Sequence, residues 1–154
     1  MDNRSEVRAS LSSRRARMPM SAADLRTIYV DYLQAANDRE FHRMAEFVHD
    51  TLVFNGDPVS RDDYVAAMRQ AVDSVRDYTW RLDDLVIEGE RAAARLTVTG
   101  TPVREWRGLQ PTGRDVTFTE CAFYHFRDGR FERMWYLLDT RAIEEQLAGL
   151  PQSS

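Results

Sequence analysis

Two carboxylates in the last third of the chain, Glu120 and Asp139, are the side chains best suited to chemistry in this sequence. They lie in apolar, aromatic-rich segments on either side of Asp128-Gly129, a dipeptide that strongly favours a two-residue hairpin turn. Pairing the two strands around that turn puts Phe118 opposite Asp139 and Glu120 opposite Leu137. Because side chains alternate along a strand, both carboxylates are expected on one face of the sheet.

Two carboxylates in an apolar pocket can divide acid and base work between them. Each is desolvated and repelled by the other, so at least one pKa should rise toward neutrality. One ionised and one protonated carboxyl group would suit an enolisation followed by protonation. The alternative is structural, with Asp139 capping a C-terminal helix at 139–148 and Glu120 pairing with Arg95 or Arg133.

Aromatic side chains on this face and in earlier segments would suit a flat aromatic or polyene ligand. We predict that the pocket is lined by Trp135, Tyr124, Phe54, Tyr32 and Trp80. The alternative for each of them is a place in the ordinary hydrophobic core. A Tyr hydroxyl beside a ligand carbonyl could act as an oxyanion donor, and the sequence does not single out which Tyr.

The opposite face of the hairpin is also largely apolar and includes Phe123, Met134, Tyr136 and Leu138. A half-exposed antiparallel sheet would show one polar face, so both faces here need cover. The helices of so short a chain can cover one face, and a second copy is the economical cover for the other. We therefore predict a homodimer joined through this face. A bulge in either strand would exchange the two faces locally.

Composition and spacing point away from metals, nucleotides, nucleic acids and membranes. His42, His49 and His125 form no metal-binding spacing such as His-x-x-x-His, and no glycine-rich phosphate loop is present. The net charge of −4 argues against a general nucleic-acid binder. No apolar run approaches the roughly 20 residues of a membrane span. We expect a cytoplasmic protein without cofactor or metal that acts on a small hydrophobic substrate.

The elements that must position these residues fall into one domain. Residues 1–20 are rich in Ser and Arg and predict a disordered tail, 21–150 predict the folded domain, and 151–154 a second tail. Capping-box spacings at Ser21 and Ser60 open two helices, the first ending near Asn37, with a short helix between them.

From residue 78 the sequence becomes rich in Val, Thr and aromatic residues, punctuated by turn residues. The predicted strands are 78–88, 91–101, 115–127 and 130–138, with a long loop at 102–114. An earlier β-rich run at 51–54 stops at Asn55-Gly56. Helices first and a strand meander afterwards predict an α+β fold, with the helices packed on one face of a curved antiparallel sheet.

Several of these segments resemble one known family. They are the hairpin at 86–96, the stretch from Gly100 to Val116, and the closing hairpin at 126–131 with Trp135 and Asp139 after it. Over residues 21–150 the chain is similar to SnoaL-like polyketide cyclases of the nuclear transport factor 2-like superfamily. The resemblance implies a cone of helices and curved sheet around a deep apolar cavity, in a homodimer.

The resemblance also implies chemistry. The founding activity of the family is a cofactor-independent intramolecular aldol ring closure in polyketide biosynthesis. Asp139 lies in the region of the cyclases' acidic base, Asn55 matches the polar residue that ends the first strand, and the cyclases' pocket His falls on Ala122. We hypothesise that Asp139 is the principal acid–base residue of a cyclase or isomerase, assisted by Glu120 and by a donor such as Asn55.

Fold alone does not fix function, and two alternatives remain open. Other members of the superfamily isomerise steroids, open epoxides, dehydrate or hydroxylate, or only bind and assemble. One alternative is therefore an epoxide-opening or rearranging enzyme. The other is a non-catalytic small-molecule-binding or assembly module.

Overall fold

The computed structural model describes residues 19–149, so residues 1–18 of the first predicted tail and all of the second tail lie outside the described residues. The helices are α2 (Ala22–Asn37), the 3-10 turn η1 (Phe41–Arg43), α3 (Met44–Phe47), α4 (Arg61–Ser74) and α5 (Thr140–Ala148). The strands are β1 (Val48–Phe54), β2 (Asp57–Ser60), β3 (Val75–Glu88), β4 (Arg91–Pro102), β5 (Val116–Arg127) and β6 (Arg130–Leu138). The predicted α+β fold is confirmed.

The two long N-terminal helices begin where the capping residues predict. Ser21 Oγ accepts a hydrogen bond from the Asp24 N–H at 3.1 Å, and the Asp24 carboxylate accepts one from the Ser21 N–H at 3.2 Å. Ser60 Oγ likewise accepts from the Asp63 N–H at 3.1 Å. Each bond satisfies a backbone donor that the first helical turn leaves unpaired.

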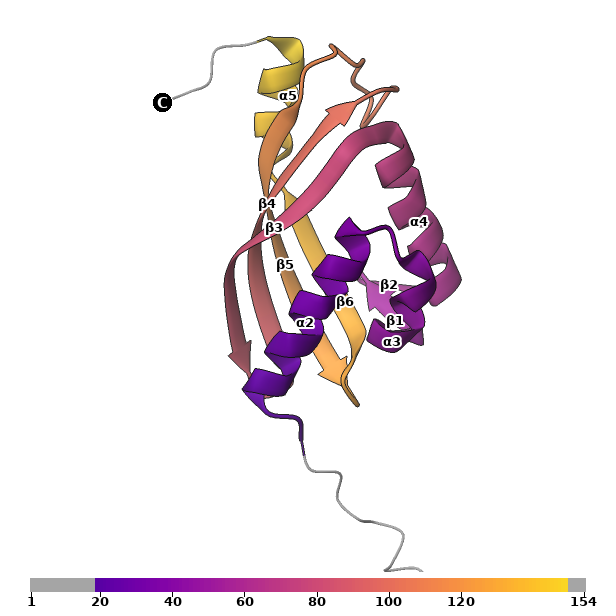
Figure 1. Cartoon of the computed structure of the whole chain (residues 1–154), viewed down its shortest axis with the longest axis vertical. Helices are drawn as coiled ribbons and strands as arrows, with labels where there is room; N and C mark the ends of the chain where they lie inside the picture. Colours follow the sequence, from indigo (N-terminus) through magenta and orange to yellow (C-terminus); the bar gives the residue numbers. More distant parts are fainter. Residues whose placement is uncertain (1–18, 150–154) are drawn as a thin grey trace, which may run out of the picture.

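The sheet has six strands in the order β2-β1-β6-β5-β4-β3. All neighbours are antiparallel except β1 and β6, which run parallel. Figure 1 shows α2 and α4 on the same side of the curved sheet, with α5 at one end of it. The hydrophobic core fills the space between these helices and the sheet. Short β2, which pairs with β1, was not predicted.

A bulge displaces β6 by one residue against β5. Around the Asp128-Gly129 turn the pairing is the predicted one, with Phe126 opposite Phe131. Beyond a register shift between His125 and Phe126, Tyr124 pairs with Met134 and Glu120 pairs with Leu138. The predicted partner of Glu120, Leu137, is therefore wrong by one position.

This one-residue displacement turns the far half of β6 over, because side chains alternate with period two. Met134, Tyr136 and Leu138 face inward, whereas we had assigned them to the outer face. Leu137 is 76% exposed, and the Trp135 ring packs against His125 with centroids 5.5 Å apart. The predicted membership of the two faces is therefore wrong for this part of β6.

No helix among residues 19–149 is long and apolar enough to cross a membrane.

Candidate functional site

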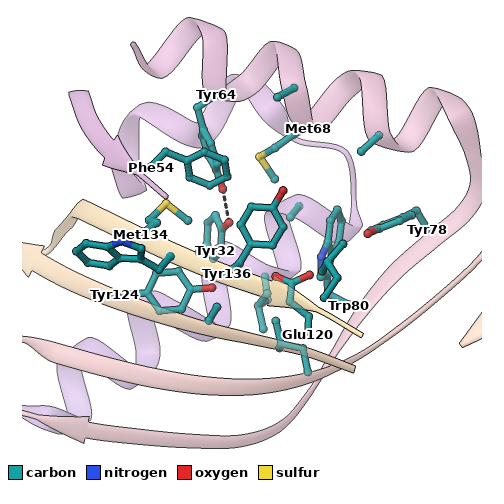
Figure 2. A pocket seen from close by; sticks show the side chains of 18 of the residues that line it. Tyr32, Phe54, Tyr64, Met68, Tyr78, Trp80, Glu120, Tyr124, Met134 and Tyr136 are labelled. Carbon is teal, nitrogen blue, oxygen red and sulfur yellow. Dashed lines mark hydrogen bonds between the residues drawn. The ribbon is translucent and has the colours of Figure 1, made fainter. Parts of the chain in front are cut away.

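A cavity of about 170 Å³ lies between the helices and the inner face of the sheet. Figure 2 shows its lining side chains converging from α2, α4 and the strands. Most of them are aromatic or apolar, including Tyr32, Phe54, Tyr64, Met68, Tyr78, Trp80, Tyr124, Met134 and Tyr136. Trp106 and the exposed Arg107 line the cavity from the loop between β4 and β5, so the cavity reaches solvent at this loop. A mostly apolar concavity with few polar groups is typical of a small-molecule site.

Glu120 is the one carboxylate among the described residues that line this cavity. Burial raises its pKa from the ordinary 4.5 to about 7, and a hydrogen bond from the Trp80 indole acts in the opposite direction. No ion pair joins Glu120 to any residue in 19–149. Arg95, which the sequence offered as a partner for Glu120, instead pairs with Asp83, and its Nη1 lies 3.6 Å from Asp83 Oδ2.

The end of α2 fixes the position of Trp80. The Asn37 side-chain amide donates to the Trp80 carbonyl at 2.8 Å, and the Asn37 side-chain oxygen accepts from the Trp80 N–H at 2.9 Å. Both backbone groups of Trp80 are thereby tied to the helix. This holds the Trp80 indole in the cavity wall, beside the Glu120 carboxyl group (Figure 2).

Two hydrogen-bonded tyrosine pairs add polar groups to the apolar wall. The hydroxyls of Tyr32 and Tyr64 lie 2.5 Å apart, and those of Tyr29 and Tyr124 lie 3.1 Å apart. Burial raises the pKa of all four phenols well above the ordinary value. They are therefore neutral at physiological pH and act as hydrogen-bond donors and acceptors, not as bases.

Five predicted site residues lie together at the cavity. They are Glu120, Tyr124, Phe54, Tyr32 and Trp80. Trp135 also borders the cavity, but its ring packs on the outer face against His125.

Asn55 is exposed and does not line the cavity. Its side-chain oxygen accepts from the Tyr136 N–H at 2.9 Å, and its own N–H donates to the Met134 carbonyl at 2.9 Å. Asn55 therefore positions β6, where we had expected it to contact substrate.

Asp139 lies outside the cavity, and the structure does not bring it together with Glu120. It is exposed and caps α5, where its carboxylate accepts from the Ala142 N–H at 3.0 Å. Its own N–H donates to the Thr119 carbonyl at 2.9 Å, so it lies beside Thr119 and not opposite Phe118. The physical reason is again the bulge in β6. The structural alternative for Asp139, a helix cap, is the arrangement observed.

Sequence reasoning missed several residues of the cavity wall. Tyr64 and Met68 lie four residues apart on α4, the helix that the capping residue Ser60 predicts, so their helical spacing was a signal for a common buried face. Tyr136 and Leu138 were placed on the wrong face by the single bulge. Arg107 comes from a loop without periodicity, and no sequence signal marked it.

Within residues 19–149, no group of three or more His, Cys, Asp or Glu side chains is arranged to hold a metal ion.

Comparisons with known proteins agree with this architecture. A crystal structure of a SnoaL-like polyketide cyclase from Agrobacterium tumefaciens is 34% identical, with a TM-score of 0.76, over 80% of this chain and 97% of that one. TsrD from Streptomyces laurentii is 26% identical, with a TM-score of 0.77, over 85% and 99%. AclR from Streptomyces galilaeus, a proposed hydroxylase, is 26% identical, with a TM-score of 0.72, over 85% and 100%. None of the curated proteins matches the chain.

The family model described as SnoaL-like polyketide cyclase matches residues 24–147, from the first turn of α2 to the last turn of α5. The match therefore includes all the residues that line the cavity, and not only the three segments between residues 86 and 139 that first suggested the family. With the helices, the sheet order and the apolar cavity all in place, the chain belongs to the SnoaL-like polyketide cyclase family.

Proposed function

We propose that this protein is a cofactor-independent acid–base enzyme that acts on a small hydrophobic metabolite, as a ring-forming polyketide cyclase or isomerase, with Glu120 as its acid–base residue. One observation carries the proposal. Glu120 is the one carboxylate among the described lining residues, and its pKa is about 7. A general base works best when its pKa lies near the operating pH, because both protonation states are then available.

The proposed reaction begins when ionised Glu120 removes a proton from a carbon next to a substrate carbonyl. The electron pair of that C–H bond moves onto the carbonyl oxygen and gives an enolate. The Tyr32–Tyr64 pair has two hydroxyl protons, one of which joins the pair, so the other is free to donate to the enolate oxygen. Both phenols stay neutral because burial raises their pKa.

Ring closure follows when the enolate carbon attacks a second carbonyl carbon of the same molecule. A new C–C bond forms, and the attacked oxygen becomes an alkoxide. Protonated Glu120 returns its proton to that alkoxide, which restores the carboxylate. Protons and electrons balance without an external oxidant or reductant.

The first step can be tested with 2-tetralone, a small bicyclic ketone with acidic α-protons. NMR in deuterated buffer measures how fast these protons exchange. We expect the wild-type protein to accelerate the exchange, and Glu120→Gln to slow it by a factor of roughly 10² to 10⁴. Asp139→Asn is the matched control and should exchange like the wild type. A folded Glu120→Gln variant that exchanges as fast as the wild type would contradict the proposal.

The raised pKa of Glu120 also favours a second candidate reaction, the opening or rearrangement of an epoxide. Below its pKa of about 7, Glu120 would donate a proton to the epoxide oxygen while water attacks the ring carbon and the C–O bond breaks. The attacking water would then lose a proton to the Glu120 carboxylate, which restores the acid. Conversion of styrene oxide that depends on Glu120, without tetralone exchange, would favour this reaction. Binding of tetralone without exchange in any variant would instead indicate a non-catalytic binding module.

We further infer that the protein is a homodimer, joined through the outer face as the structure defines it. Val86, Ala93, Phe123 and Trp135 are successive cross-strand partners and form one row over β3, β4, β5 and β6. Val86 is 60% exposed and Phe123 is 56% exposed. Exposed apolar patches that run across a sheet usually mark interfaces.

Analytical ultracentrifugation tests the dimer. Phe123→Asp places a charge at the centre of the row and should shift the protein to a monomer. Val30→Asp is the control, because Val30 is 50% exposed on α2 and away from this face. A wild-type protein that sediments as a monomer at micromolar concentration would refute the dimer.

A further inference from the structure

The tip of the loop between β4 and β5 is a tight, fixed turn at the cavity. Trp106 and Leu109 exchange backbone hydrogen bonds, each 2.9 Å long. Arg107 and Gly108 between them both have positive φ, 53° and 76°, which defines a type I′ turn. The Trp106 ring packs against Phe118 and Tyr78, with centroids 5.8 and 6.3 Å apart, and anchors the turn to the cavity wall.

Arg107 is an unexpected residue for the first central position of this turn. Asn, Asp and Gly are favoured there because they tolerate a positive φ, whereas a long side chain with a Cβ is strained. The chemistry of the turn therefore does not account for an arginine. Residues other than glycine that are held at positive φ tend to occur at functional sites.

The guanidinium of Arg107 has no hydrogen-bond or ion-pair partner among residues 19–149. The Glu105 carboxylate, two residues away, accepts a hydrogen bond from the Gln110 amide at 3.0 Å. Glu144 of α5 lines a second hollow together with Arg107, but no ion pair joins the two. The five N–H donors of the guanidinium thus stay available to a ligand.

Arg107 lines both the apolar cavity and this second hollow, so it lies between the interior and solvent. Its charge acts on Tyr78 in the cavity wall: burial raises the pKa of that phenol, and the positive charge of Arg107 works in the opposite direction. A ligand whose apolar ring lies against Glu120 and the aromatic wall would extend its polar end past Arg107. Guanidinium groups recognise carboxylates through two parallel hydrogen bonds.

We propose that Arg107 binds a carboxylate carried by the substrate itself, so that the substrate is a ring compound with a free acid group at the mouth of the cavity. The inference rests on the proposed function and deepens it by naming a substrate class, an acid as opposed to a neutral ketone or ester. Arg107 is then a specificity-determining residue, and Glu120 remains the acid–base residue.

The test compares two ligands of nearly equal shape, 2-naphthoate and the neutral 2-acetylnaphthalene. Binding is followed by NMR of the protein with labelled methionine methyl groups, since Met68 and Met134 line the cavity and report its occupation. Titrations at about pH 6 keep Glu120 mostly protonated, because its pKa is about 7. The measured quantity is the ratio of the two dissociation constants, ketone over acid.

We expect Arg107→Gln to lower this ratio by about threefold to tenfold, the range for a charge-assisted contact that is partly exposed. The affinity for the neutral ketone should change less than about twofold. Arg104→Gln is the matched control, because Arg104 is exposed in the same loop and does not line the cavity. Added salt should shrink the preference of the wild type and leave that of Arg107→Gln unchanged.

A ratio that is the same in the wild type and in Arg107→Gln would overturn the inference. So would an equal fall of the ratio in Arg104→Gln, because the effect would then be one of general charge. The binding ratio is independent of proton exchange in tetralone. If Arg107→Gln lowers the binding ratio but the wild type does not accelerate proton exchange, only the proposed enzyme activity is refuted. If the wild type accelerates exchange but Arg107→Gln leaves the ratio unchanged, only the carboxylate site is refuted.

Discussion

Replacing Glu120 by Gln should stabilise the fold at high pH and change little at low pH. Burial raises the pKa of Glu120 from 4.5 to about 7. Below pH 4.5 both the folded and the unfolded chain hold this proton. Between pH 4.5 and 7 the folded chain keeps the proton that the unfolded chain has released, so the free energy of unfolding falls as the pH rises. Above pH 7 both forms are ionised, and the loss is complete.

The size of the effect follows from the same pKa. One pKa unit corresponds to about 1.4 kcal/mol, so an ionised Glu120 costs the folded state about 3 kcal/mol above pH 7. Gln keeps the shape of the side chain and carries no charge at any pH. The variant should therefore gain about 2 to 3 kcal/mol over the wild type between about pH 5 and about pH 8.5.

Urea unfolding of both proteins at these two pH values measures the difference directly. All other titrating groups are common to the two chains, so their contributions cancel. Glu88→Gln is the matched control, because it makes the same change of side chain at an exposed position at the end of β3, outside the cavity. A Glu120→Gln gain that is equal at both pH values would refute the argument that burial disfavours the ionised carboxyl group.

Two further outcomes follow from the placement of single residues. Asp139→Asn should leave the free energy of unfolding in urea within about 0.5 kcal/mol of the wild type, since Asn caps a helix about as well as Asp. Asp139→Ala should lower it by about 1 kcal/mol. Equal losses in both variants would show that Asp139 does not act as the cap. Gly100→Ala should lower the free energy of unfolding by about 1 to 3 kcal/mol in the same assay, because the new Cβ would lie 2.5 Å from Val75 Cγ1 and 3.3 Å from the Tyr78 Cα. An unchanged urea midpoint would mean that β3 and β4 do not approach as closely as described.

Much of the fold could be predicted from the sequence because local chemistry specifies it. Side-chain caps at Ser21 and Ser60 satisfy the first turns of α2 and α4, and the apolar stripes behind them have helical period. Asp128-Gly129 adopts positive φ at both residues, 54° and 74°, as a tight hairpin turn requires. These signals lie within a few residues of one another, so no long-range contact was needed to interpret them.

The candidate site could be predicted only in part because it depends on one unpaired residue. Nothing in the sequence around Glu132 announces the bulge, and a displacement of one position exchanges every side chain beyond it. Tyr136 and Asp139 were misplaced for this single reason. Glu120 lies on β5, where the pairing with β4 is regular, and its predicted place on the inner face was right.

The exclusion of Asp139 changes the chemistry that the cavity can support. With two carboxylates, one could accept a proton while the other donates one, and repulsion between them would set their pKa values apart. With Glu120 alone among the described lining groups, burial raises its pKa, and the group must take up a proton before it can return one. A single shuttle suits reactions in which the same proton leaves one carbon and returns to an atom of the same molecule. Isomerisation and intramolecular aldol closure are such reactions, and neither needs a second carboxylate.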